Sequence, residues 1–159
     1  MACPKHVISA LTPLANTKTV IVCIGNSLKG DDGAGPEIYE KLKGRISADL
    51  INAGTVPENY ISRIAGLSPQ NLLIIDAVDF KADPGEIRVF DRKEIPDYIS
   101  STHSLSPGVF AEVIRKQCNV RIYFLGIQPA SATLCSNLSD PVRNSVNNIS
   151  DLLTRLFYH

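Results

Sequence analysis

The sequence predicts a single α/β domain, a three-layer sandwich in which helices cover both faces of a mainly parallel, twisted sheet with an antiparallel strand at one edge. Three short apolar runs, residues 19–24, 71–78 and 121–127, contain many β-branched residues and are typical of strands buried on both faces. Segments with helical periodicity lie between these runs. Because parallel strands need long crossover connections, this alternation indicates an α/β sheet rather than an all-β fold.

Two further strands are expected at weaker positions. Residues 50–51 are a short apolar pair that ends at Ala53-Gly54. Residues 86–90 alternate polar and apolar side chains, which favours an edge strand with one face in water. The sequence Asp83-Pro84-Gly85 before that strand predicts a tight turn, since Pro and Gly occupy positions that suit one.

Four helices are expected between the strands. The first covers residues 36–43, with Pro36 at its first position and Gly44 after its end, and a shorter one covers residues 58–65. The third follows the predicted N-cap Ser106, and the last begins at Asp140 with an apolar stripe over residues 142–156. The expected apolar face of the third helix contains Val109, Phe110, Val113 and Ile114.

Composition and charge exclude several classes of protein. The 159 residues include sixteen basic and sixteen acidic side chains, so bulk charge does not favour nucleic acid or an anionic membrane as a partner. No apolar run approaches the roughly 20 residues of a membrane span. We expect a cytoplasmic monomer with a loosely held N-terminal extension, residues 1–18, and one domain over residues 19–159.

The four cysteines, at positions 3, 23, 118 and 135, form no C-x-x-C pair. Their spacing matches neither a zinc site nor a dense disulfide framework. Cys23 lies inside an apolar run, where a free cysteine behaves as a small core residue. The cysteines are therefore interpreted as structural.

Three polar segments are expected at the carboxyl edge of the sheet, where open α/β folds bind their ligands. Residues 25–33 follow one strand, residues 76–79 end another, and residues 101–104 precede the helix capped by Ser106. These segments carry Asp32, Asp76 and His103. Two carboxylates and one imidazole can hold a divalent transition-metal ion and leave coordination positions open for a further ligand.

Each of these residues also has a structural explanation. Carboxylates favour helix N-termini, and we assign that role to Asp31 in preference to Asp32. Asp76 interrupts an apolar strand, where a carboxylate needs a hydrogen bond, a cation or access to a cleft. A single loop histidine such as His103 is most often incidental. The metal-site hypothesis therefore depends on the three residues together.

Other chemistries fit the sequence less well. Gly25 and Gly30 have the spacing of a phosphate-binding loop, but Asp31 and Asp32 stand where such a loop carries Lys and Ser or Thr. The sequence contains no G-x-S-x-G nucleophile elbow, and no cysteine lies in a recognisable catalytic neighbourhood. A pepsin-like pair of carboxylates would need two symmetric halves, and the chain has no internal repeat.

Five motifs, in consistent order along the chain, resemble those of the hydrogenase maturation endopeptidases. They are GNSLKGDDGAGP (25–36), LLIIDAVDF (72–80), DPGEIRVFD (83–91), THSLSP (102–107) and FLGIQP (124–129). The resemblance covers residues 19–155 and is closest to the branch that processes the large subunit of formate-hydrogenlyase-type, group 4 NiFe hydrogenases. It implies a phosphorylase/hydrolase-like α/β fold.

The resemblance also implies a function and a site. Family members remove a C-terminal extension from a nickel-loaded NiFe hydrogenase large-subunit precursor, and their metal ligands fall here on Asp32, Asp76 and His103. These residues would also be catalytic, in a nickel-dependent endopeptidase of the aspartic type. Nickel would arrive with the substrate, so we expect no permanent cofactor. The alternative is a flavodoxin-like metal-binding module or nickel chaperone that cuts no peptide.

Overall fold

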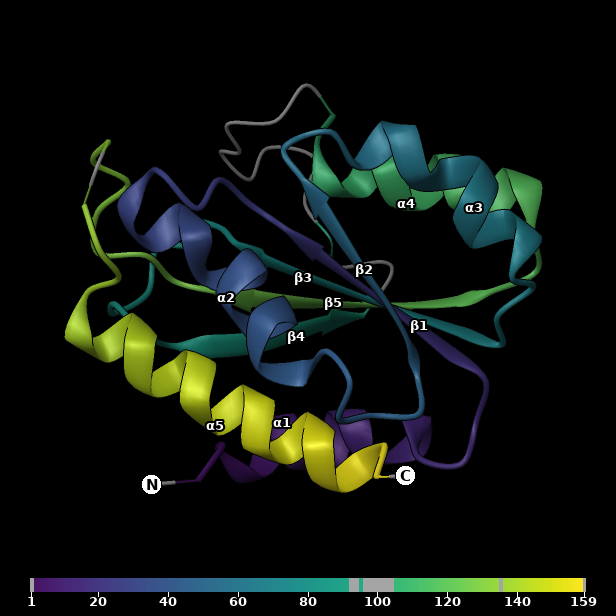
Figure 1. Ribbon diagram of the computed structural model, residues 1–159, viewed down its shortest axis with the longest axis horizontal. Helices are drawn as coiled ribbons and strands as arrows, with labels where there is room; N and C mark the ends of the chain where they lie inside the picture. Colours follow the sequence, from purple (N-terminus) through teal and green to yellow (C-terminus); the bar gives the residue numbers. More distant parts are fainter. Residues whose placement is uncertain (1, 92–94, 96–104, 135, 159) are drawn as a thin grey trace.

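The computed structural model describes residues 2–91, 95, 105–134 and 136–158. Its strands are β1 (Thr19–Ile24), β2 (Asp49–Gly54), β3 (Asn71–Ala77), β4 (Ile87–Asp91) and β5 (Arg121–Ile127). They form one sheet in the order β2-β1-β3-β5-β4 (Figure 1). β4 pairs antiparallel with β5 at one edge, and the other pairings are parallel. The predicted sheet is confirmed.

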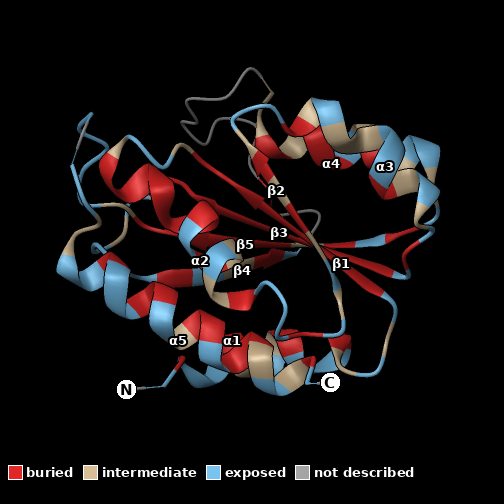
Figure 2. Ribbon diagram, viewed as in Figure 1, coloured by how far each residue is buried: buried red, intermediate tan, exposed pale blue. Residues whose placement is uncertain are grey.

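Helices cover both faces of this sheet. α1 (Lys5–Leu11), α2 (Ala34–Leu42) and α5 (Asp140–Leu156) lie on one face, and α3 (Ile61–Gly66) and α4 (Pro107–Gln117) lie on the other (Figure 1). Successive strand side chains point to opposite faces, so Ile21 and Cys23 join one buried cluster while Val20 and Val22 join the other. Figure 2 shows the strands almost continuously buried between these layers. The predicted three-layer sandwich is confirmed.

The apolar stripes of the two long helices agree with the sequence pattern to different degrees. In α5 the stripe from Val142 to Leu153 is buried as expected. In α4 the Ser106 hydroxyl accepts the Val109 N–H at 3.3 Å, which confirms the N-cap. The buried face of α4 is centred on Phe110, Ala111 and Ile114, however, and Val109 is 43% exposed. Within the described residues, no helix is both long and apolar enough to cross a bilayer.

Two helix starts differ from the sequence prediction. α2 begins at Ala34, so Pro36 is its third residue and not its first. Because the first four N–H groups of a helix have no partner within it, proline is tolerated there. The segment predicted as one helix over 58–65 begins instead as a 3₁₀ turn, η3 (Pro57–Tyr60), before α3. In both places a tight turn precedes the α-helix.

The turn before β4 has the predicted form. The Glu86 N–H donates to the carbonyl of Asp83 at 3.0 Å, and Gly85 has a φ of 85°. Proline at the second position and a left-handed glycine at the third are the requirements of a type II turn. A side chain at Gly85 would also meet the backbone of Pro141, so this turn packs closely on the start of α5.

The N-terminal segment is part of the core, which corrects the expectation of a loosely held extension. α1 and the 3₁₀ turn η1 (Thr12–Leu14) bury Val7, Leu11 and Leu14 completely. These side chains belong to the same buried cluster as the apolar stripe of α5. The His6 ring lies 3.3 Å from the carbonyl oxygen of Ile87, at the edge of the sheet. Burial on this scale stabilises the segment through the hydrophobic effect.

The strand register brings the polar segments to one edge of the sheet. Cys23 of β1 lies beside Ile75 of β3, and Asp76 lies beside Gly126 of β5. The loop after β1 and the end of β3 are therefore neighbours at the carboxyl edge. The 3₁₀ turn η2 (Gly30–Gly33) within that loop contacts β3.

Candidate active site

The loop after β1 folds back on itself around Gly25. A side chain there would overlap the carbonyl oxygen of Asp32, and the φ of 150° is rare for other residues. The Asn26 N–H lies 3.0 Å from that carbonyl and 3.1 Å from the Asp32 carboxylate. Glycine at position 25 thus permits the close approach that places η2 over the end of β1.

Asp32 lies at the carboxyl edge but is almost enclosed, with 6% of its surface exposed. Its Oδ2 accepts the Asn26 N–H, so the carboxylate is held by the same loop that carries it. Gly33 and Gly35 follow it, and Gly35 packs so tightly on Ile24 that a side chain would overlap the Ile24 carbonyl oxygen. Asp32 is therefore fixed against the end of β1.

Asp31 has a structural role, although its partners differ from those expected at a helix start. Its carboxylate accepts the N–H groups of Ala130 at 2.8 Å, Ser131 at 3.2 Å and Ser139 at 2.7 Å, and also the Ser139 hydroxyl at 2.8 Å. These donors belong to the connection between β5 and α5. Asp31 is 1% exposed, and it joins two segments about a hundred positions apart in the sequence.

Asp76 is the next-to-last residue of β3 and is fully buried. The remaining residues of that strand are buried too, and most of them are apolar. Burial of a carboxylate is costly unless hydrogen bonds or a cation stabilise it. An acidic residue at this position is consequently a strong candidate for a site.

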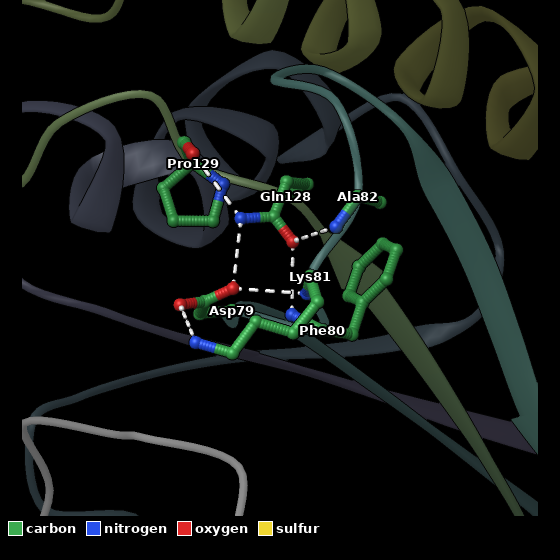
Figure 3. A network of polar contacts seen from close by, with 6 residues as sticks. All are labelled: Asp79, Phe80, Lys81, Ala82, Gln128 and Pro129. Carbon is green, nitrogen blue, oxygen red and sulfur yellow. Dashed lines mark hydrogen bonds and ion pairs between the residues drawn. The ribbon is translucent and has the colours of Figure 1, made fainter.

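Asp79 organises the loop that follows Asp76. Its Oδ1 accepts the Lys81 N–H at 2.9 Å and the Gln128 side-chain amide at 3.1 Å, and its Oδ2 lies 3.2 Å from the Lys81 ammonium (Figure 3). Hydrogen bonds from the Lys81 backbone and from Gln128, together with the Lys81 side chain, lower the pKa of Asp79. Lys81 itself has a positive φ of 63°, which this network holds in place.

Gln128 is a residue to which the sequence analysis assigned no role, although it falls within the motif FLGIQP. It lies directly after β5 and is 6% exposed. A signal was available, because Gln128 is a lone polar residue at the end of a buried strand, as Asp76 is on the neighbouring strand. Figure 3 shows its amide between Asp79 and the backbone of residues 80–82.

His103, the third predicted ligand, lies outside the described residues. The structure therefore places Asp32 and Asp76 on contacting elements, while the position of His103 relative to them stays a prediction. Among the residues that are described, no three His, Cys, Asp or Glu side chains gather as a metal site would require. The two buried carboxylates nevertheless have the chemistry of divalent-metal ligands.

A cleft of about 310 Å³ opens beside η2. Gly33, next to Asp32, forms part of its wall, and Glu37, Asn52 and Leu138 line it from α2, β2 and the segment before α5. A second hollow of about 280 Å³ shares Glu37 and Leu138 and reaches Arg143 on α5. The two hollows are neighbours, since they share wall residues, and are together called the groove.

Fold and site together define an α/β protein with two enclosed carboxylates at the carboxyl edge of its sheet and a groove beside η2. Residues 36–156 match the sequence profile of the family described as hydrogenase maturation protease. Hydrogenase 3 maturation protease of Escherichia coli K12 is 35% identical over 133 residues, which are 82% of this chain and 85% of that protein. The chain belongs to the hydrogenase maturation protease family.

Solved structures agree with this assignment. The crystal structure of the NiFe hydrogenase maturation protease HycI from Thermococcus kodakarensis KOD1 matches with a TM-score of 0.83 and 28% identity, covering 96% of this chain and 98% of that one. The solution structure of the endopeptidase HycI from Escherichia coli matches with a TM-score of 0.77 and 33% identity, covering 87% and 90%. The resemblance noted from the five motifs is confirmed.

Proposed function

We propose that this protein is an endopeptidase that removes the C-terminal extension of a NiFe hydrogenase large-subunit precursor after nickel insertion. Membership of the hydrogenase maturation protease family supports peptide-bond hydrolysis and a hydrogenase precursor as the substrate. The observation that carries the proposal is the burial of Asp32 and Asp76 on contacting elements at the carboxyl edge. Neither carboxylate is one of the exposed charges that a helix presents to water.

In the proposed mechanism, the nickel ion is part of the substrate and is recognised by Asp32, Asp76 and His103. Carboxylate and imidazole groups are suitable ligands for nickel, and three of them leave coordination positions for the precursor's own ligands. The ion would draw the adjacent peptide bond into the site and can polarise its carbonyl. This arrangement makes cleavage depend on nickel loading, and the protein itself then needs no permanent cofactor.

As the alternative to metal-assisted cleavage, Asp32 or Asp76 acts as a general base. It would take a proton from the attacking water, whose oxygen adds to the scissile carbonyl carbon, and return the proton to the nitrogen of the released tail. The groove beside η2 would hold the chain that flanks the cleaved bond, and a monomer would suffice for all these roles.

The direct test incubates nickel-loaded precursor with wild-type protein, Asp32→Asn or Asp76→Asn and measures the precursor's C-terminal mass. Asn keeps the shape of each side chain but removes the charge. We expect loss of processing by about 100-fold or more, as for groups that act in the transition state. Asp49→Asn is the matched control, because Asp49 is exposed at the opposite, amino end of the sheet. Full processing by Asp76→Asn would remove the proposed site.

The same experiment separates the peptidase from a metal-binding module or nickel chaperone. Both would bind nickel through the same residues, but only the peptidase shortens the precursor. A precursor that takes up or loses nickel with an unchanged C-terminal mass would support the non-catalytic alternative.

A further inference from the structure

The connection between β5 and α5, described over residues 128–134 and 136–139, contacts both the loop that carries Asp32 and the loop that follows Asp76. On one side, Gln128 Oε1 accepts the N–H groups of Phe80 at 2.8 Å and Ala82 at 3.2 Å, while its Nε2 donates to Asp79 Oδ1 at 3.1 Å (Figure 3). These residues lie three to six positions after Asp76. The side-chain amide of Gln128 thus bonds to the backbone of this loop in the way that a neighbouring strand would.

On the other side, the connection holds η2. The Asp31 carboxylate receives its four hydrogen bonds from Ala130, Ser131 and Ser139, as described above. Backbone bonds run parallel to them, since the Gly30 N–H donates to the Ser136 carbonyl at 3.2 Å and the Asp31 N–H to the Ser131 carbonyl at 2.8 Å. Asp32 directly follows Asp31, the residue that these hydrogen bonds hold.

We infer that the described part of this connection, residues 128–134 and 136–139, is a scaffold that sets the separation of Asp32 and Asp76, with Gln128 and Asp31 as the two positioning residues. The inference rests on the proposed function, because it concerns how that site is held. Groups behind metal ligands fix the ligands' orientation, and a site loosened by as little as about 1 Å loses much of its affinity. Both positioning side chains are at least nine-tenths buried, as a rigid support requires.

The inference assigns a specific chemical requirement to position 128. The residue must accept two N–H groups at one atom and donate to a carboxylate at the other, which a side-chain amide does and a carboxylate does not. Gln128→Glu would keep the two acceptor contacts but set a negative oxygen against Asp79. Asp79→Asn in addition would remove the repulsion between the two carboxylates, while its amide oxygen can still accept the Lys81 N–H.

The experiment compares Gln128→Glu, Asp79→Asn and the double variant with wild type. Gln70→Glu is the matched control, because Gln70 also accepts a backbone N–H but is exposed just before β3, at the amino edge. Nickel ion alone, in competition with a colorimetric chelator, gives the affinity. Precursor processing gives kcat and KM, the melting temperature reports folding, and amide hydrogen exchange at Phe80 and Ala82 reports the loop.

Gln128→Glu should weaken nickel affinity by about tenfold or more, lower kcat and speed exchange at the two amides, while the fold is retained. The double variant should recover part of the affinity, because the charge repulsion is removed, and Gln70→Glu should change nothing. Unaltered nickel affinity in a folded Gln128→Glu protein, or no recovery in the double variant, would overturn the inference. If Asp32→Asn and Asp76→Asn also bind and process normally, the proposed function fails as well, so the two failures are distinguishable.

Discussion

The adjacent carboxylates of Asp31 and Asp32 bind different parts of the chain. That of Asp31 accepts donors from the connection before α5, whereas that of Asp32 accepts the Asn26 N–H of its own loop. Asp31 thus anchors the loop, and Asp32 is held at the carboxyl edge of the sheet. The two acids of the motif GDDG have separate functions.

The first prediction concerns this anchor. Asp31→Ala should lower the free energy of unfolding by about 1.5–3 kcal/mol, because it removes the buried, charged acceptor of the hydrogen bonds from Ala130, Ser131 and Ser139. Urea denaturation measures the change. Asp140→Ala removes an acid that is exposed in a surface ion pair with Arg143, so it should cost no more than about 1 kcal/mol. Equal effects of the two substitutions would contradict the anchoring role.

The second prediction concerns the close contact between α2 and β1. Gly35→Ala should destabilise the protein by about 2 kcal/mol or more, because the new methyl group would overlap the backbone of Ile24. Gly66→Ala, at the end of α3, meets no atom within 4 Å and should change stability by less than about 1 kcal/mol. Denaturation curves of both variants provide the comparison, and a neutral Gly35→Ala would show that α2 sits further from β1.

Thiol reactivity gives a third prediction. Burial raises the pKa of Cys3 to about 11 and that of Cys23 further still, and both are enclosed in the core. Since the thiolate is the reactive form, iodoacetamide at pH 8 should modify the partly exposed Cys118 before Cys3, and Cys23 only after unfolding. Peptide mass mapping over time measures the order. Rapid labelling of Cys23 in native protein would contradict the packing of β1.

The fourth prediction is a pH dependence with a defined sign. The pKa of Asp79 is lowered in the folded protein, so its contribution to stability is present above the ordinary aspartate pKa of about 3.9 and is lost as the pH falls through the folded value. The difference in melting temperature between wild type and Asp79→Asn should therefore shrink between pH 7 and pH 3. A difference that grows on acidification would mean that the network of Lys81 and Gln128 does not favour the charged form.

The groove beside η2 supplies a fifth prediction. Leu138→Trp should raise the KM for precursor, because Leu138 lines both parts of the groove, while nickel affinity stays unchanged. Leu134→Trp is the control, since Leu134 is 63% exposed on the same connection and lines neither hollow. Processing rates over a series of precursor concentrations give the KM of each variant. An equal KM for the two variants would place the bound chain elsewhere.

The sheet was predictable because its signals are local. The β-branched apolar runs define β1, β3 and β5 within a residue or so, and Asp83-Pro84-Gly85 specifies its own turn. α1 was not predicted, since seven residues between Pro4 and Pro13 give too short a pattern to recognise. Its burial comes from tertiary contacts with the cluster that includes α5, which no local pattern reveals.

The site was predictable only as far as its residues stand at strand ends. Asp76 was found because a carboxylate inside an apolar strand is unusual, and Asp32 because it follows a buried strand. The partners of Asp31 lie about a hundred residues away, and Gln128 contacts a loop 46 to 49 positions distant. Because both contacts join distant segments, no local sequence pattern predicts them. The role of His103 stays a prediction.

The measurement that tests the central claim most directly is anomalous diffraction at the nickel absorption edge, on crystals of this protein soaked with nickel ion. The account predicts one strong peak within coordination distance of both the Asp32 and Asp76 carboxylates, absent from crystals of Asp76→Asn. A peak bound elsewhere on the protein, or the same peak retained in Asp76→Asn, would show that these two carboxylates do not share an ion.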